Sequence, residues 1–215
     1  MCIVWFIDRG WVAEWSIAAV LKTVEGRPSG SSNLSPSAII NASDDRGVFL
    51  LGMIMTTKTN VMRILQAAKI DFTTYEYDPA KGIDAKSVAS SVGKPEEQVF
   101  KTLVTQSPTQ QHSFEHFVFV IPSNQELDLK KAALAAKVKS LEMLPLKKLQ
   151  PLTGYVHGGC SPVGMKKAFP TFIDETALLF DSFCVSGGKI GLTLQMNAQQ
   201  LALLINATFA DLTIN

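Results

Sequence analysis

The sequence predicts a mixed α/β or α+β domain and not a regular doubly wound one. Short strand-like segments and amphipathic helical segments alternate irregularly over the part of the chain after residue 52. A Gly187-Gly188 pair between two strand-like segments indicates a hairpin, and therefore antiparallel neighbours. Apolar residues make up 47% of the chain and charged residues 18%, which is enough apolar mass for a full core.

Helices are predicted where apolar residues recur at helical spacing behind a capping residue. The first has Val61, Ile64 and Leu65 on one face, and Asn60 is its expected cap. Asp84 and Gly93 bound the second, and Pro95 marks another helix start. Further helices are expected over residues 128–138, 146–152 and 197–205.

Strands are predicted from alternation or from short apolar runs. Residues 72–78 alternate and place Tyr75 and Tyr77 on one face. Residues 116–121 are almost continuously apolar, which indicates a central strand. The other expected strands are residues 99–105, 140–144, 171–174, 180–185 and 190–196.

The composition changes near residue 52. All three tryptophans lie in the first 15 residues, and residues 28–47 are rich in Ser, Pro, Gly and Asn, as linkers are. Residues 12–38 resemble the conceptual translation of a serine tRNA gene, with D-arm, anticodon and T-loop in order. We therefore expect residues 1–52 to be a non-native or disordered extension, with the true start at Met53 or Met55, and residues 53–215 to form one domain. The alternative is an ordinary extension with a helix over residues 12–22.

The charge balance excludes a strongly basic nucleic-acid-binding protein. The net charge is +1 for the whole chain, and 16 Lys and Arg against 14 Asp and Glu give +2 for residues 53–215. A nucleic acid would have to be held by a local patch. Three lysine pairs could contact phosphates, although each can also be a solvated surface pair; they are 130–131, 147–148 and 166–167.

The same composition limits the compartment. No stretch reaches the roughly 18 uncharged apolar residues of a membrane span, so no membrane partner is expected. Three cysteines are too few for a disulfide framework, which favours a reducing, cytoplasmic setting.

Lys101 is the most informative single residue. Its strand is largely apolar on both faces, so an ammonium group there needs a partner. One interpretation is a lysine that projects into a pocket toward an anionic group or a developing oxyanion. The other is an edge-strand lysine that extends to water.

Two glycine-rich segments could approach a ligand closely. In residues 154–167, Gly158 and Gly159 would let backbone N–H groups reach a phosphate or carbonyl, but the spacing of a Walker loop is absent. In residues 185–191, Ser186 could donate to a substrate beside a Gly-Gly turn. Each segment can also be purely structural.

His157 and Cys160 lie three residues apart and suggest a thiol nucleophile. No Asp or Asn that would orient the histidine is identifiable, and a single cysteine is more often a small buried residue. Paired Cys and His ligands at zinc spacing are absent, so neither a metal nor a cofactor is expected.

Four segments together resemble the YbaK-type family, free-standing deacylases of cysteinyl-tRNA(Pro). They are V-F-K-T-L-V (99–104), S-N-Q-E-L-D-L-K-K-A (123–132), G-Y-V-H-G-G-C-S-P-V-G-M-K-K (154–167) and V-S-G-G-K-I-G-L (185–192). The resemblance spans roughly residues 56–213 in order. It implies a mixed, barrel-like sheet flanked by helices. The insertion domain of bacterial prolyl-tRNA synthetases shares the lysine-bearing strand.

The resemblance also implies site residues. Lys101 matches the essential lysine of the family, which would orient and polarise the aminoacyl end of the tRNA. The other matches are Tyr77 in the pocket wall, Gly158 and Gly159 with Ser161 in the loop that holds the aminoacyl group, Ser186 and Gly188 in the second glycine turn, and Asn124 at the rim. The family does not need a cysteine at position 160.

The implied activity is trans-editing of Cys-tRNA(Pro), and also of Cys-tRNA(Cys), without a cofactor. The substrate thiol would attack its own ester and release a cysteine thiolactone and free tRNA. The expected partners are the aminoacyl-tRNA and prolyl-tRNA synthetase, which would deliver it, and neither DNA nor a membrane. Two alternatives stay open: editing of Ala- or Ser-tRNA through an activated water, and a non-catalytic module that binds tRNA or a synthetase, with Lys101 as an anion contact.

Overall fold

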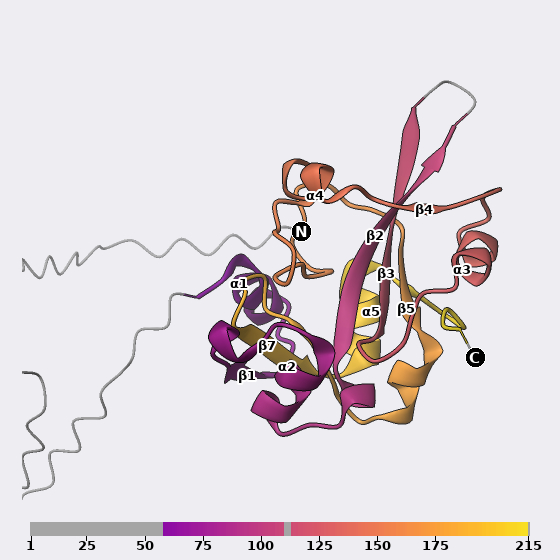
Figure 1. Ribbon diagram of the computed structural model, residues 1–215. Coiled ribbons are helices and arrows are strands. Elements are labelled where there is room, and N and C mark those ends of the chain that lie inside the picture. Colours follow the sequence, from indigo (N-terminus) through magenta and orange to yellow (C-terminus); the bar gives the residue numbers. More distant parts are fainter. Residues whose placement is uncertain (1–57, 110–112, 215) are drawn as a thin grey trace, which may run out of the picture. The chain divides into compact units, whose positions relative to one another are not determined.

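The computed structural model describes residues 58–109 and 113–214, which belong to one compact unit (Figure 1). The expected N-terminal extension, residues 1–52, lies outside the described residues. No helix in the described ranges is long and apolar enough to cross a membrane.

The strands form two sheets, as a mixed fold requires. The first is antiparallel, in the order β1 (Phe72–Glu76), β7 (Leu192–Met196) and β6 (Phe183–Ser186). The second has the order β4 (Glu142–Met143), β2 (Phe100–Pro108), β3 (Phe114–Pro122), β5 (Thr171–Asp174) and β8 (Thr208–Ala210). Its first three strands are antiparallel, and its last three are parallel. The predicted mixed architecture and the hairpin at Gly187-Gly188 are confirmed.

The described residues form no closed barrel, so the barrel-like detail implied by the family resemblance is not confirmed. The two sheets meet at one isolated parallel bridge, between Val99 and Cys184, where β2 and β6 begin. Beyond this bridge no ladder continues between them, because residues of both strands line a pocket there. Two sheets joined at a corner therefore replace a closed barrel.

The helices follow the predicted capping residues, with one exception. α2 (Ala85–Val92) runs from an Asp84 cap to a left-handed Gly93, and α5 (Ala198–Ile205) begins after Asn197. The cap of α1 (Asn60–Ala67) is Thr59, not Asn60, because the Thr59 side chain accepts a hydrogen bond from the amide of Met62. The remaining helical segments are α3 (Leu129–Ala135), α4 (Leu146–Thr153) and the short 3-10 turns η2 (Pro79–Lys81), η3 (Glu96–Gln98) and η4 (Glu175–Leu179).

The central strand β3 organises the core, as its apolar run predicts. Val118 and Val120 are fully buried on one face, in a cluster that includes Phe183 of β6. Phe119 and Ile121 are fully buried on the other face, in a second cluster that packs against α3. Hydrophobic burial on both faces fixes β3, and so fixes β2 beside it with its lysine.

Asp174 ties the parallel end of this sheet to the C-terminal segment. It is 1% exposed, its Oδ1 accepts from the amide and hydroxyl of Thr176, and its Oδ2 accepts from the amide of Leu212. We expect Asp174→Ala to lower the free energy of unfolding by about 3 kcal/mol, because buried donors lose a charged acceptor. Denaturant titration measures this change. The exposed Asp181→Ala is the control, and an equally small loss from both variants would contradict the assignment.

Candidate functional site

A pocket of about 330 Å³ lies where the two sheets meet. β2, β6, β7, the start of α2 and the loop after α4 all contribute to its wall, so residues distant in sequence converge there. The lining residues are Tyr77, Ile83, Asp84, Val88, Val99, Phe100, Lys101, Thr102, Leu103, Ser123, Leu149, His157, Gly158, Cys160, Val185, Ser186, Leu192 and Thr193. The wall is mostly apolar with a few polar groups, the usual character of a small-molecule site.

Half of the site residues expected from the family resemblance line this pocket. Lys101, Tyr77, Gly158 and Ser186 are in its wall. The other four lie outside the lining: Gly159 and Ser161 are buried behind it, Gly188 packs against Tyr155, and the exposed Asn124 reaches Glu97 at 3.4 Å.

Lys101 is half-buried on β2, opposite Ile121 of β3. Its Nζ donates to the carbonyl oxygen of Ser123 at 3.1 Å. Burial lowers the pKa of the Lys101 ammonium, and the carboxylate of Glu126 partly offsets this effect. Because an ammonium has three N–H donors, donors remain for a group bound in the pocket.

The strand around Lys101 has a ladder partner on one side only. β4 pairs with β2 at Thr105 and Gln106, and the amide of Leu144 donates to the carbonyl of Val104, so along residues 100–103 β3 is the only ladder partner within the described residues. Lys101 thus lies on a partial strand edge, and this edge faces the pocket. Lys101 lines the pocket, as the first interpretation expects, whereas β2 as a whole lies between β4 and β3 and is not an edge strand, as the second interpretation requires.

Thr102 is a polar group that sequence reasoning missed. Its Oγ1 is buried and has no hydrogen-bond partner among the described residues, although Thr102 lines the pocket. A buried hydroxyl without a partner costs free energy, so a ligand that bonds it would regain that energy. The signal in the sequence was a threonine within an otherwise apolar strand face.

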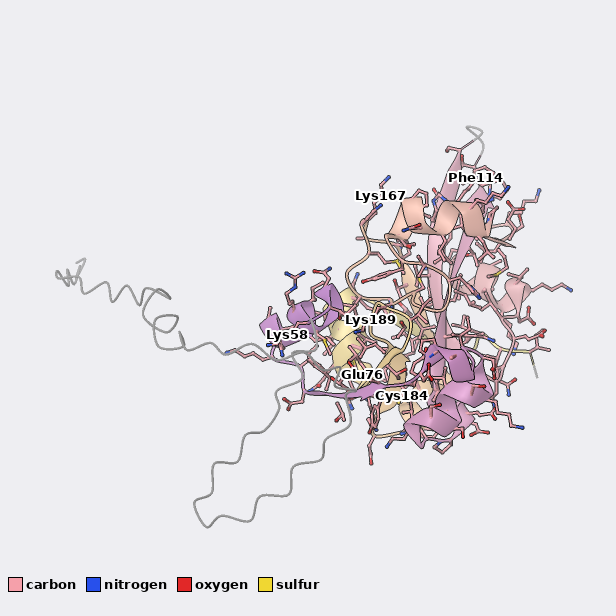
Figure 2. The ribbon with its side chains drawn as sticks, turned by 60° about the vertical axis from the view of Figure 1, so that its left-hand side comes forward. Lys58, Glu76, Phe114, Lys167, Cys184 and Lys189 are labelled. Carbon is pink, nitrogen blue, oxygen red and sulfur yellow. The ribbon has the colours of Figure 1, made fainter. Side chains whose placement is uncertain are left out.

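The two glycine-rich segments pack backbone against backbone. A Cβ on Gly159 would lie 3.0 Å from the amide nitrogen of Ile190 and 3.1 Å from the carbonyl carbon of Lys189. Figure 2 shows Lys189 in the middle of the domain, on the turn between β6 and β7. This close approach brings Gly158, which has a left-handed φ of +77°, and Ser186 into one pocket wall.

Tyr155 stabilises this contact between the two glycine-rich segments from the side of Gly188. Its hydroxyl donates to the carbonyl of Val163 at 2.6 Å, and a Cβ on Gly188 would lie 3.1 Å from its ring. Burial raises the pKa of Tyr155 to about 12, so the phenol remains a neutral donor. The hydrogen bond closes the loop over residues 155–163 and holds it against the second turn.

Cys160 and His157 both line the pocket, but the thiol is not activated. Cys160 is buried, and burial raises its pKa to about 12. Cys184, at the bridge between the sheets, is fully buried with a pKa raised to about 11. Burial is the cause at both thiols; the charge of Lys94 offsets it only in part at Cys184, so neither thiol is shifted toward the thiolate. The described residues also contain no group of three or more His, Cys, Asp or Glu that could hold a metal ion.

The buried thiol gives a direct prediction. Cys160 should react with iodoacetamide at pH 8 at least about a hundredfold more slowly than free cysteine, because so little of it is thiolate. Mass spectrometry of the native and urea-unfolded protein measures the rate at each cysteine. Fast labelling of Cys160 before unfolding would contradict the prediction.

Comparison with known proteins identifies the family. The family model for the aminoacyl-tRNA editing domain matches residues 80–204. A candidate Cys-tRNA(Pro)/Cys-tRNA(Cys) deacylase of Enterococcus faecalis, EbsC, is 43% identical over 157 residues, which cover 73% of this chain and 93% of that protein.

Solved structures share the fold. A candidate trans-editing enzyme for prolyl-tRNA synthetase is 24% identical with a TM-score of 0.60, over 73% of this chain and 99% of that one. A hypothetical protein is 20% identical with a TM-score of 0.64, over 72% and 99%. The family match covers more than half of the chain and includes every pocket-lining residue except Tyr77. The chain therefore belongs to the aminoacyl-tRNA editing domain family.

Proposed function

We propose that this protein is a free-standing deacylase that removes cysteine from Cys-tRNA(Pro), and also from Cys-tRNA(Cys). The observation that carries the proposal is the convergence of the Lys101 ammonium and the Gly158 loop on one pocket in a member of the editing family. A volume of about 330 Å³ is near the lower end for ligand pockets, and suits an aminoacyl group with part of its ribose.

Each pocket residue has a role in this proposal. The Lys101 ammonium polarises the ester carbonyl and stabilises the oxyanion that develops on it. The Gly158 segment places its backbone beside the aminoacyl group, and Tyr77, directly after β1, and Ser186, at the end of β6, bound the rest of the pocket.

The proposed step needs no nucleophile from the protein. The thiol sulfur of the substrate attacks its own carbonyl carbon, a C–S bond forms, the C–O bond to the ribose breaks, and the thiol proton passes to the ribose oxygen. The product is a cysteine thiolactone with a four-atom ring. Because this ring is strained, the pocket must hold the sulfur against the carbonyl and stabilise the oxyanion.

The setting of the reaction belongs to the same proposal. With a net charge of +1, the chain has little general attraction for tRNA, so prolyl-tRNA synthetase would deliver the substrate. Such editing takes place where translation occurs, in the cytoplasm. Residues 53–215 would be the catalytic domain.

Substrate choice tests the mechanism. We expect rapid deacylation of Cys-tRNA(Pro) and little of Ala- or Ser-tRNA, because alanine and serine lack the thiol. A side-by-side assay with trapping of the thiolactone measures both the rates and the product. Equal hydrolysis of all three substrates would favour an activated water, and binding without deacylation would favour a non-catalytic module; either result would overturn the proposed step.

Lys101→Ala should lower kcat/KM by at least about a hundredfold, because the oxyanion loses its cation. The free energy of unfolding should change by less than about 1 kcal/mol, because the ammonium bonds a single carbonyl in the described structure. Lys139→Ala, at an exposed lysine, is the control. Full activity in Lys101→Ala would remove the residue from the mechanism.

Gly159→Ala tests the contact between the glycine segments. Its added Cβ would push against the Ile190 backbone, and we expect at least a tenfold fall in kcat/KM with a loss of about 1–3 kcal/mol in stability. Gly93→Ala is the matched control: its left-handed φ of +69° costs about 1 kcal/mol, but no atom lies within 4 Å of its Cβ. The contact has no role in the site if both variants keep full activity.

A further inference from the structure

A group of exposed lysines lies on α4 and the following loop, two segments that also contribute residues to the pocket wall, and has no role in the proposed chemistry. We define the α4 lysine surface as Lys147 and Lys148 on α4 with Lys166 and Lys167 at the end of the following loop. All four are exposed. The sequence contains them as two of three lysine pairs that could contact phosphates.

Backbone contacts bring the two pairs together. The amide of Lys166 donates to the carbonyl of Thr153 at 3.0 Å, which ties the end of the loop to the end of α4. The Nζ of Lys166 lies 3.4 Å from the carbonyl oxygens of Gln150 and Pro151, in the last turn of the same helix. A cation at a helix C-terminus is favourable, so Lys166 has a structural role there.

Lys148 and Lys167 converge near the strand hairpin. The Lys148 Nζ lies 5.1 Å from the ring centroid of Phe114, and the ring of His116 meets that of Phe169 at 6.1 Å. Burial first, and then the charges of Lys148 and Lys167, lower the pKa of His116. In Figure 2, Lys167 and Phe114 lie at the same end of the domain.

This surface adjoins the pocket through shared segments. α4 contributes Leu149 to the pocket wall, and the loop contributes His157 and Gly158. Among the described residues, no salt bridge involves any of the four lysines, and Glu115 and Glu142 on the neighbouring strands do not pair with them. Four like charges without counter-ions favour binding of a polyanion.

We propose that the α4 lysine surface binds the phosphates of a duplex RNA stem whose single-stranded 3′ end enters the pocket. The inference rests on the proposed function, which places an aminoacylated 3′ end in that pocket. Lysines act as point charges toward phosphates, so binding is independent of sequence and weakens steeply with salt. A local surface of this kind lets a chain with a net charge of +1 hold an RNA.

Binding of an uncharged RNA tests the surface without any catalysis. The probe is a fluorescent minihelix with an acceptor-stem duplex and a CCA end, and anisotropy gives Kd over a range of salt concentrations. The test variant is Lys147→Gln/Lys148→Gln/Lys167→Gln, which spares the helix contacts of Lys166. The matched control is Lys130→Gln/Lys137→Gln/Lys139→Gln, which removes the same charge from the first turn of α3 and from the segment after it.

We expect the test variant to raise Kd at least tenfold and to reduce the slope of log K against log salt by about 2 to 3, while the control stays within twofold. Equal weakening by both variants, or no weakening by the test variant, would overturn the proposal. If the wild type binds the minihelix through these lysines but does not deacylate Cys-tRNA, the proposed function fails and the RNA surface stands.

Discussion

The pocket depends on one close backbone contact, that of Gly159 with the Lys189–Ile190 peptide. No side chain larger than hydrogen fits at Gly159 without displacing the Ile190 amide, 3.0 Å from where a Cβ would lie. The contact joins the loop after α4 to the turn between β6 and β7, and so sets the distance between His157 and Gly158 on one side and Ser186 on the other. Backbone is stiffer than a side chain, so this wall is preorganised before any ligand arrives.

Lys101 occupies a position that the fold leaves incompletely satisfied. β3 fixes the strand through core burial, while the other edge has no ladder partner around Lys101 among the described residues, because β4 pairs only at Thr105 and Gln106. The ammonium has a single carbonyl acceptor in the described structure, and burial lowers its pKa. Next to it, the Thr102 hydroxyl has no acceptor or donor. Polar groups that lack hydrogen-bond partners in the folded protein are expected at functional positions, because a bound ligand can supply those partners.

Helices and strands that have strong local signals could be predicted from the sequence. Features that depend on contacts between residues distant in the sequence could not. α2 between Asp84 and Gly93, and α5 after Asn197, follow their caps, and β5 matches residues 171–174. β8 was missed because its three residues are strand only through pairing with β5. Lys101 stood out as a charge in an apolar strand. The pocket itself joins residues from Tyr77 to Thr193, and no local pattern tells a glycine that packs on backbone, such as Gly159, from one that lines a site, such as Gly158.

The protonation of the Cys160 thiol helps to decide whether the protein or the substrate supplies the nucleophilic sulfur. This thiol lies in the pocket wall, yet burial raises its pKa to about 12, so the fold keeps it protonated. If Cys160 were the nucleophile, its thiol would have to lose a proton in the occupied pocket. A bound substrate would exclude more water from the thiol and raise its pKa further. In the proposed reaction the substrate thiol would enter from solvent and meet the Lys101 ammonium, whose charge favours the anionic form of any nearby group. A pocket that suppresses its own thiol and offers a cation to its ligand is therefore suited to a reaction in which the substrate supplies the nucleophile.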